Sequence, residues 1–408
     1  MLIKDMWKIL PIICALLLTV ACSPTAVNEN SEATVPVSLF EPSLTPVTET
    51  EATATEPVAT VKPSATPTIK PEPTTPAPMH PLAGLLFRDG QEIWILDENG
   101  EPLFVFDDPS ARLSADGRLV LFSPEYDPDI WLANLETGER RNLTESSGRY
   151  NGLPQWWPGQ EDVIIFGSSD MLGPGVGNPT IVRTDGSDYH VLDQERSGPL
   201  ALSADGELLA YGGFDHPGRI VSHGSEPEDF YPSDYGLDVE GVFKPAWSPD
   251  GRKLAWKVSG DAEKHGWTSG IAVFDLENKS AELFHTYTKL GGGSVPHNVS
   301  WSPGGDWLAF VTFNERPEDG RRPTLWIAHP DGQGEMRLGV AFDTAWSPDG
   351  DQIAYSLYDV SQETFQVWLH DTATGEQTQI LPAGTTVVDW LEPTSELMQR
   401  LRQYSVNQ

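Results

Sequence analysis

Cysteine is scarce in this chain, which has only Cys14 and Cys22 among its 408 residues. Cys14 lies in an apolar N-terminal stretch that we expect to be removed as a signal peptide. A mature chain beginning at Cys22 would contain no pair of thiols, so no disulfide could form within it. Stability must then come from packing, for which a domain of about 300 residues is large enough.

Several motifs that mark enzymes and metal sites are also missing. The chain has no Gly-x-Ser-x-Gly elbow, no phosphate-binding loop, no His-Glu-x-x-His and no cysteine-rich metal cluster. We therefore predict no catalytic residues, no metal ligands and no cofactor. Acidic loops at 124–129 and 225–234 could offer oxygen ligands to Ca²⁺, although neither has the ligand spacing of a known calcium loop.

Basic residues are few, with 26 Lys and Arg against 60 Asp and Glu, for a net charge of −34. Residues 22–80 have seven Glu and two Lys, and after the N-terminal stretch is also set aside, residues 81–408 carry a charge of −30. Such a field opposes binding to nucleic acid and to anionic membrane surfaces. It favours cations, basic peptides or uncharged ligands such as glycans, unless the charge serves solubility alone.

Long hydrophobic runs are absent except at the N-terminus. There Lys4 and Lys8 precede about 13 apolar residues, a length typical of a signal peptide rather than a membrane span. The following "LTVAC" resembles the cleavage box of bacterial lipoproteins. The resemblance implies a signal peptide over 1–21, a lipid on Cys22 and a location in the cell envelope, at the extracytoplasmic face of a bacterial membrane. An ordinary secretory signal with an incidental cysteine is the alternative.

Residues 22–80 have almost no large apolar side chains. The segment consists mainly of Thr, Pro, Ala and Glu, so it cannot bury enough surface to offset chain entropy. We expect a disordered tether that reaches on the order of 40–45 Å. It could carry the following domain across a wall or surface layer, or act only as a spacer.

A short unit recurs through the rest of the chain. It reads "PAWSPDGRKLAWKVSG" at 245–260, "VSWSPGGDWLAFVT" at 299–312 and "TAWSPDGDQIAYSL" at 344–357. Pro and Gly within the Ser-Pro-Asp-Gly stretch favour a tight turn between two strands. After the turn, Leu254, Trp256 and Val258 alternate with smaller or polar residues, as expected of a strand with one bulky face.

Aligned copies place one residue of each unit in the column of Trp247, at intervals of about 44 residues with one of about 54. The column contains Leu113, Trp156, Leu202, Trp247, Trp301, Trp346 and Trp390. A third strand such as "GIAVF" or "TLWIA" follows each time, and then a turn and a weaker fourth strand. Four strands in each period of this length predict an all-β propeller.

The ends of the array indicate how the propeller closes. Residues 84–106 supply a second, third and fourth strand without a first, and 387–393 supply a first strand without a second. Joining them gives a composite blade and a ring of seven blades over 81–393, with six blades as the alternative. Closure removes exposed sheet edges. We expect residues 394–408 to be a C-terminal tail whose loss is mild.

The repeated "AWSPDG", followed by a Leu-Ala-aromatic strand, resembles the WD-repeat-like unit of TolB-type propellers and of the propeller domain of prolyl oligopeptidase-like enzymes. The resemblance covers residues 82–393 and implies the propeller fold. It does not imply the envelope role of TolB, whose propeller has six blades and an additional N-terminal domain. Nor does it imply peptidase activity, which requires a hydrolase domain.

The long connections of the propeller should leave one face, which we call the long-loop face. These are the links from the second to the third strand and from the fourth strand to the next blade. Variable loops on a rigid scaffold are where binding concentrates. The candidate ligand-binding residues are Tyr231, Tyr235, Trp267, Tyr287, Phe313, Arg321, Arg322 and Tyr358. Trp267 is the strongest, because its loop between polar segments offers the indole little local core.

Two classes of function remain. The first is a monomeric, membrane-anchored, non-enzymatic binding or scaffold module for a protein, peptide or glycan. The alternative is a propeller enzyme, such as a glycan lyase or hydrolase, with an active site at the long-loop face and an acid and a base from several blades. An enzyme should show carboxylates or histidines with perturbed pKa values near the channel mouth, whereas a binding module should show aromatic side chains and satisfied polar groups.

Overall fold

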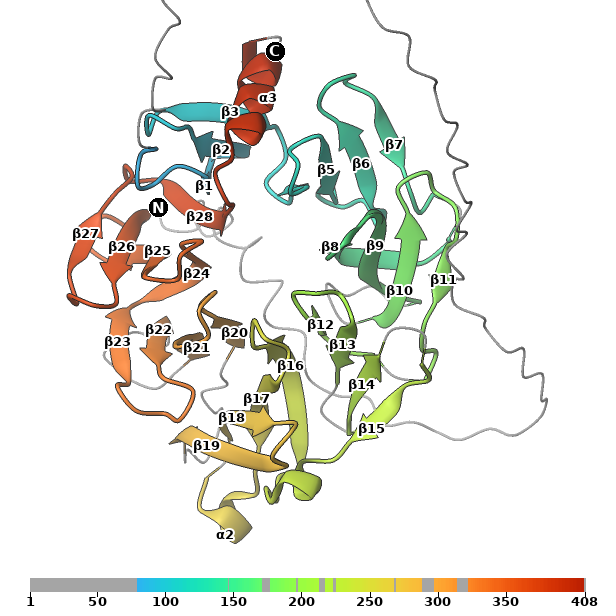
Figure 1. Ribbon diagram of the computed structural model, residues 1–408, viewed down its shortest axis with the longest axis vertical. Coiled ribbons are helices and arrows are strands. Elements are labelled where there is room, and N and C mark those ends of the chain that lie inside the picture. The colour runs from blue at the N-terminus through green and yellow to red at the C-terminus, as the bar shows by residue number, and fades with distance from the viewer. Residues whose placement is uncertain are drawn as a thin grey trace, which may run out of the picture. The chain divides into compact units, whose positions relative to one another are not determined.

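Seven four-stranded antiparallel sheets lie around a common centre in the computed structural model (Figure 1). The structure describes residues 79–145, 147–170, 177–195, 197–212, 217–222, 225–267, 269–287, 297–313 and 322–406. Each sheet is one blade of a β-propeller, with its first strand innermost and its fourth outermost (Figure 1). The predicted all-β, seven-bladed fold is confirmed, and the six-bladed alternative is wrong.

Six blades are continuous in the chain. Blades 1 to 3 contain β4 (Arg112–Leu113), β5 (Leu119–Phe122), β6 (Trp131–Asn134), β7 (Arg140–Asn142); β8 (Tyr150–Trp157), β9 (Gln160–Ser169), β10 (Asn178–Arg183), β11 (His190–Val191); and β12 (Leu200–Leu202), β13 (Leu208–Tyr211), β14 (Gly218–Ser222), β15 (Glu228–Phe230).

Blades 4 to 6 follow in the same order. They contain β16 (Gly241–Trp247), β17 (Lys253–Ser259), β18 (Ser269–Asp275), β19 (Ser280–Tyr287); β20 (His297–Trp301), β21 (Leu308–Phe313), β22 (Pro323–Ala328), β23 (Met336–Gly339); and β24 (Ala341–Trp346), β25 (Gln352–Asp359), β26 (Thr364–Asp371), β27 (Gln377–Gln379). Three short helices accompany the described blades, namely the 3-10 helix η1 (Pro232–Tyr235), α2 (Ala262–His265) and α3 (Ser395–Val406).

Blade 7 joins the two ends of the propeller, as the sequence predicts. Its inner strand β28 (Thr385–Trp390) pairs antiparallel with β1 (Leu85–Asp89), with Leu85 opposite Trp390. The blade continues through β2 (Glu92–Leu96) and β3 (Pro102–Phe106). Pairing between chain segments about 300 residues apart therefore closes the ring and completes the four strands of blade 7.

The recurring turn owes its sequence to a small hydrogen-bond network. Ser248 Oγ donates to Asp250 Oδ1 at 2.6 Å and accepts from the backbone N–H of Lys253 at 2.9 Å. Gly251 has a φ of 68°, the left-handed conformation that glycine tolerates best. The same Ser–Asp contact recurs at Ser203 and Ser347, so the motif is explained by turn formation.

The tryptophans of the repeat column join neighbouring blades. The indole Nε1 of Trp247 donates to the carbonyl oxygen of Ala201 at 3.1 Å, and that of Trp301 donates to Ala246 at 2.9 Å. Trp156 makes the equivalent bond to Arg112 O at 3.2 Å. Each indole thus adds a directional bond to the apolar area it buries against the preceding blade.

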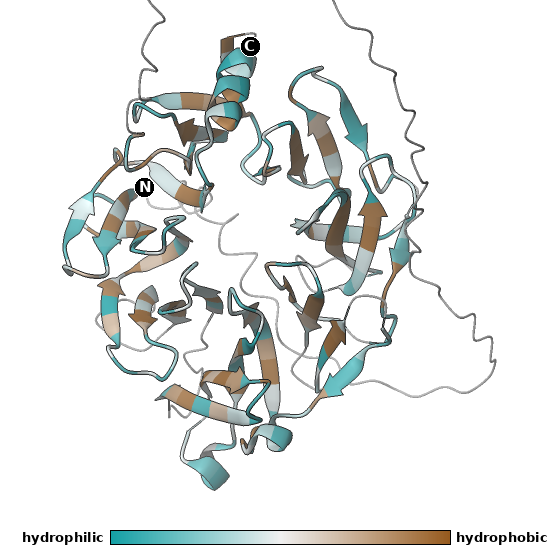
Figure 2. Ribbon diagram, in the orientation of Figure 1, coloured by the Kyte–Doolittle hydropathy of each residue, from teal (hydrophilic) through white to brown (hydrophobic). Residues whose placement is uncertain are grey.

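The hydrophobic core lies in the spaces between blades. Figure 2 shows apolar residues concentrated in the inner and middle strands, whereas outer strands such as β7 and β15 are largely hydrophilic. Between blades 3 and 4, Trp256, Phe230 and Phe274 are all buried and their rings pack together. Interlocked side chains of adjacent blades therefore hold the ring together.

The expectation that loss of the C-terminal residues would be mild assumed a free tail, and that assumption is wrong for residues 395–406. They form α3, whose Leu397, Met398 and Leu401 are buried in one cluster with Phe106 of β3 and Leu113 of β4. Gly117 shows how closely the helix packs, because an added Cβ there would lie 2.4 Å from the Leu397 side chain. The helix is part of the core between blades 7 and 1.

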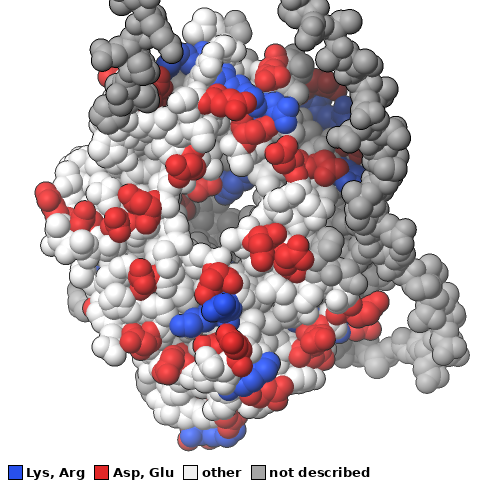
Figure 3. Space-filling view, in the orientation of Figure 1, with Lys and Arg blue, Asp and Glu red and all other residues white. Residues whose placement is uncertain are grey.

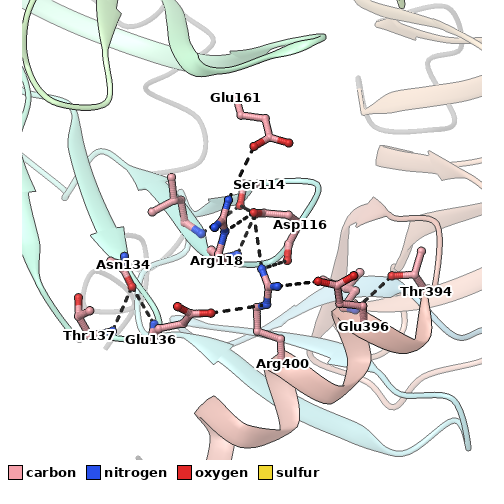
Figure 4. A network of polar contacts seen from close by, with 12 residues as sticks. Ser114, Asp116, Arg118, Asn134, Glu136, Thr137, Glu161, Thr394, Glu396 and Arg400 are labelled. Atoms are coloured by element: carbon pink, nitrogen blue, oxygen red, sulfur yellow. Dashed lines mark hydrogen bonds and ion pairs between the residues drawn. The ribbon is translucent and has the colours of Figure 1, made fainter. Parts of the chain in front are cut away.

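Polar contacts of α3 reach both of these blades. Figure 4 shows Arg400 beside Asp116 in the β4–β5 turn of blade 1, where its guanidinium donates to the Asp116 carbonyl at 3.0 Å. Arg402 reaches the β2–β3 turn of blade 7 and pairs with Asp97 at 2.7 Å and Glu98 at 2.8 Å. The helix therefore bridges the place where the ring closes.

Candidate functional site

A groove of about 190 Å³ lies on the long-loop face between blades 3 and 4. The connection from β15 to β16 forms most of it, and its lining includes Tyr231, Pro232, Leu237, Asp238, Val239 and Glu240. Tyr231 is 47% exposed, and its hydroxyl donates to Asp229 Oδ2 at 3.2 Å. A predicted aromatic residue thus lies at the edge of a concave surface.

Tyr235 lies in the same connection between β15 and β16 that forms most of this groove. It is 7% exposed, its ring stacks on Phe230 at 4.8 Å and meets Phe274 edge-on at 5.6 Å. Lys279 Nζ donates to its hydroxyl at 3.0 Å. The expectation that Tyr235 is exposed is therefore wrong, because the side chain belongs to the core of blades 3 and 4, while its role in ligand binding stays a prediction.

Trp267 lies near the same groove but is partly buried. It packs against the cluster that includes Leu237 and Val239, and its ring stacks on His265 at 5.6 Å. An added Cβ on Gly260 would lie 2.7 Å from the indole, so the loop is folded closely around it. The expectation that the indole has little core to fill is wrong in this respect, while its role in binding stays a prediction.

Two other predicted residues meet on the long-loop face across blades 5 and 6. The guanidinium of Arg322 lies 4.7 Å from the centroid of the Tyr358 ring, and Phe365 meets that ring edge-on at 5.1 Å. This arrangement is a cation–π pair supported by a second aromatic ring. The side chains of Tyr287 and Phe313, and the whole of Arg321, lie outside the described residues.

Four charged side chains lie on three inner strands and one second strand where blades 6, 7 and 1 meet. Arg112 of β4, Asp343 of β24 and Asp389 of β28 are exposed, and Arg88 of β1 is partly buried. Figure 3 shows acidic and basic side chains beside one another at the hollow in the centre of the ring. We call Arg88, Arg112, Asp343 and Asp389 the seam cluster.

The channel environment perturbs the carboxyl groups of the seam cluster. Water reaches Asp343 and Asp389, but the surrounding inner strands limit the bulk solvent around each, and this desolvation raises both pKa values. Arg88 and Arg112 oppose the rise at Asp343, and Arg112 does so at Asp389. This is the pattern of perturbed carboxylates that we expected of a propeller enzyme.

The motif analysis missed the seam cluster, although the repeat carries a signal for two of its members. The residue just before the Trp247 column is Gln155, Ala201, Ala246, Ser300 or Ala345 in five units. In blade 1 it is Arg112, and in blade 7 it is Asp389. Asp343 lies within a β-bulge of β24, where the pairing with β25 shifts, and such bulges redirect side chains.

The two acidic loops use several of their carboxylates internally. Asp127 accepts from Trp131 Nε1 at 2.9 Å, Asp129 accepts from Asn142 at 2.9 Å, and Asp229 pairs with Arg219 at 3.0 Å. Among the residues that the structure describes, no group of three or more His, Cys, Asp or Glu could hold a metal ion. Nor does this part of the chain contain a helix long and apolar enough to span a membrane.

No protein-family model matches this chain, and a curated protein is similar to part of it. The uncharacterized peptidase YuxL of Bacillus subtilis is 30% identical over 134 residues. That match spans 29% of this chain and 18% of the relative, so it covers well under two thirds of the relative's length.

Solved structures with a similar fold include several propeller proteins. An oligogalacturonate lyase in complex with manganese has a TM-score of 0.47 at 14% identity, covering 73% of this chain and 86% of the other. TolB from Acinetobacter baumannii has a TM-score of 0.40 at 15% identity, covering 75% and 66%. The structural neighbours of this seven-bladed chain thus include TolB and other propeller proteins.

Proposed function

We propose that this chain is a lipid-anchored, extracytoplasmic propeller that binds a basic peptide segment of another protein in the groove between blades 3 and 4. The observation that carries the proposal is the exposed Tyr231 at a groove whose apolar lining side chains Leu237, Val239 and Val242 belong to or pack against the buried cluster of blades 3 and 4. Lining side chains already held by the core lose little conformational freedom when a ligand binds.

Charge favours a basic peptide over the other ligands. Asp238 and Glu240 line the groove beside the apolar Leu237 and Val239, an arrangement that suits alternating basic and apolar side chains. Asp238 already pairs with Lys264 at 2.6 Å, so a basic side chain of the peptide would compete with Lys264 there, while Glu240 is the second acidic group of the lining. Residues 81–408 as a whole carry −30, so their field attracts a cationic segment from a distance. A glycan stacked on Tyr231 is the other ligand class considered, and the experiment below distinguishes it.

Lipid attachment at Cys22, residence in the cell envelope and a monomeric state complete this proposal. The "LTVAC" box and the preceding apolar run support the anchor. A tether over 23–80 would then let the propeller reorient above the membrane surface.

A peptide-binding experiment tests the groove. We expect a fluorescent peptide of alternating Lys and Leu to bind the full-length protein in detergent, and Tyr231→Ala to weaken binding at least tenfold, or about 1.4 kcal/mol. Tyr126→Ala is the matched control, because this tyrosine is 94% exposed but lies on blade 1. Fluorescence anisotropy gives the affinities. Equal losses in both variants, or equal binding of a Glu-Leu peptide, would contradict the proposal.

A glycan-binding propeller enzyme ranks second. Its specific support is the raised pKa of Asp343 and Asp389. These carboxylates lie on inner strands, whereas the enzyme predicted from the sequence would have its site in the long loops. If the protein binds chitotetraose and Tyr231→Ala abolishes that binding, the proposed ligand of the groove becomes a glycan instead of a peptide. If the protein hydrolyses or cleaves chitotetraose and Asp389→Asn abolishes that activity, the enzyme becomes the favoured function.

A further inference from the structure

The seam cluster combines opposite charges that lie near one another without pairing. Arg112 interacts electrostatically with both carboxylates, and Arg88 also does so with Asp343. Within the described residues, however, neither arginine forms an ion pair with a carboxylate. By contrast, Arg183, Arg219 and Arg400 elsewhere in the ring all do so. Each of the two guanidinium groups therefore lies beyond ion-pair distance of both carboxylates, and Arg112, Asp343 and Asp389 are exposed.

Arg88 is held in place with part of its hydrogen-bonding capacity unused. Its terminal nitrogen donates to the carbonyl of Pro109 at 2.9 Å, in the connection that leads into blade 1. Among the described residues, its buried Nε has no hydrogen-bond partner, and neither has the Oγ1 of Thr386, which lies opposite Arg88 on β28. Buried donors are ordinarily satisfied, so the surroundings of Arg88 suit a polar ligand.

The balance of charge indicates what kind of ligand fits. Two guanidinium groups and two carboxylates make the cluster neutral overall when all are ionised. A further carboxylate that acts on Arg88, that of Asp108, accepts hydrogen bonds from the backbone and hydroxyl of Ser110. A simple anion would meet the two carboxylates and the −30 field of residues 81–408, and a simple cation would meet the two arginines. A molecule with separate positive and negative groups can complement both pairs at once.

We propose that the seam cluster binds a small zwitterion of the α-amino-acid type, with its carboxylate on Arg88 and Arg112 and its ammonium on Asp343 and Asp389. The site lies on β1, β4, β24 and β28, on three consecutive blades, and is complete only when the ring is closed. It is separate from the groove between blades 3 and 4 and does not depend on the function proposed for that groove.

Three matched ligands test this assignment on the full-length protein by isothermal titration calorimetry. Glycine carries both charges, glycinamide lacks the carboxylate, and N-acetylglycine lacks the ammonium. We expect saturable binding of glycine and at least about tenfold weaker binding of each analogue. No saturable glycine binding, or equal binding of all three, would overturn the proposal.

Variants of the cluster then show which side chain recognises which charge. Arg112→Gln should weaken the binding of glycine at least tenfold and leave the residual binding of glycinamide unchanged, because glycinamide has no carboxylate for the arginine. Asp389→Asn should weaken the binding of glycine and leave the residual binding of N-acetylglycine unchanged, because N-acetylglycine has no ammonium group for the carboxylate. Arg252→Gln is the control, since this arginine is exposed on the β16–β17 turn.

The exposed positions of Arg112 and Asp389 favour folded variants, and unchanged melting temperatures would confirm this. Should Asp389→Asn disturb the fold, Asp343→Asn supplies the same test from the neighbouring blade. Equal weakening of all three ligands by Arg112→Gln would show that the arginine does not recognise the carboxylate, and the assignment would fail.

Discussion

Ser248, Asp250 and Gly251 show how single residues determine the recurring turn. Ser248 and Asp250 hydrogen bond to each other and to the backbone, and the bond from Ser248 is the main cause that lowers the pKa of Asp250. The pKa of Asp205 is likewise lowered, mainly by the hydrogen bond from Ser203. These bonds favour the ionised carboxylates, so the turns lose this support as the pH falls through the lowered pKa values.

Lys257 gives a prediction with the opposite dependence on pH. Its side chain is 3% exposed on β17, and burial, together with the nearby Lys244, lowers its pKa to about 7. The unfolded chain, with a lysine pKa of about 10.4, binds more protons between these values. Stability should therefore rise as the pH increases from about 7 to about 10.

We expect Lys257→Met to lose that rise, while Lys253→Met at the more accessible start of β17 keeps it. Urea unfolding across this pH range measures the free energy of unfolding of each variant. Parallel profiles for the parent and Lys257→Met would show that the Lys257 pKa is not lowered in the folded protein.

At the scale of elements, α3 and β28 together close the ring. β28 supplies the missing inner strand of blade 7 through its pairing with β1, and α3 covers the junction with blade 1. Arg400 and Arg402 then attach the helix to the turns of both blades. Closure thus rests on backbone pairing, apolar packing and ion pairs within the last 24 residues of the chain, numbered 385–408.

Leu401 should be important for stability because this residue of α3 has a fully buried side chain. Leu401→Ala should lower the free energy of unfolding by about 2–5 kcal/mol, as expected for a large-to-small change in a core. Val406→Ala, at a position that is 81% exposed on the same helix, should change it by less than about 0.5 kcal/mol. Urea unfolding compares the two, and similar small effects would mean that α3 is not docked in solution.

At the scale of the whole molecule, a closed ring presents two unlike faces and a central channel. The short Ser-x-Asp-Gly turns occupy one face, and the groove with Tyr231 lies on the other. The inner strands bring residues of separate blades together around the centre of the ring, where Figure 3 shows acidic and basic side chains beside a hollow. Two candidate sites thus follow from one scaffold, and we propose a ligand of different chemistry for each.

Membrane attachment of the whole protein should depend on the lipid that we propose on the sulfur atom of Cys22. If Cys22 is lipidated, Cys22→Ser should move the protein from the membrane fraction to the soluble fraction, because no other anchor is proposed. Cys14→Ser should leave the protein in the membrane fraction, since that residue would depart with the signal peptide. Fractionation followed by immunoblotting measures both. Membrane retention of a correctly processed Cys22→Ser variant would refute the lipoprotein proposal.

The sequence by itself determined the architecture, because the signals for it are local and repeated. Each turn and its flanking strands are encoded within a few residues, and the incomplete units at 84–106 and 387–393 predict the composite blade that β28 and β1 form. The long-loop face was also predictable, since strand order in a propeller decides which connections share a face.

Only the tertiary structure decided which side chains are core and which meet in space. Tyr235 and Trp267 are both aromatic residues in loops, yet packing between blades 3 and 4 buries the first and partly buries the second. The weak periodicity of 394–408 did not reveal that α3 has a docking surface. The seam cluster draws on β1, β4, β24 and β28, and side chains that far apart in the chain become neighbours only because the ring closes.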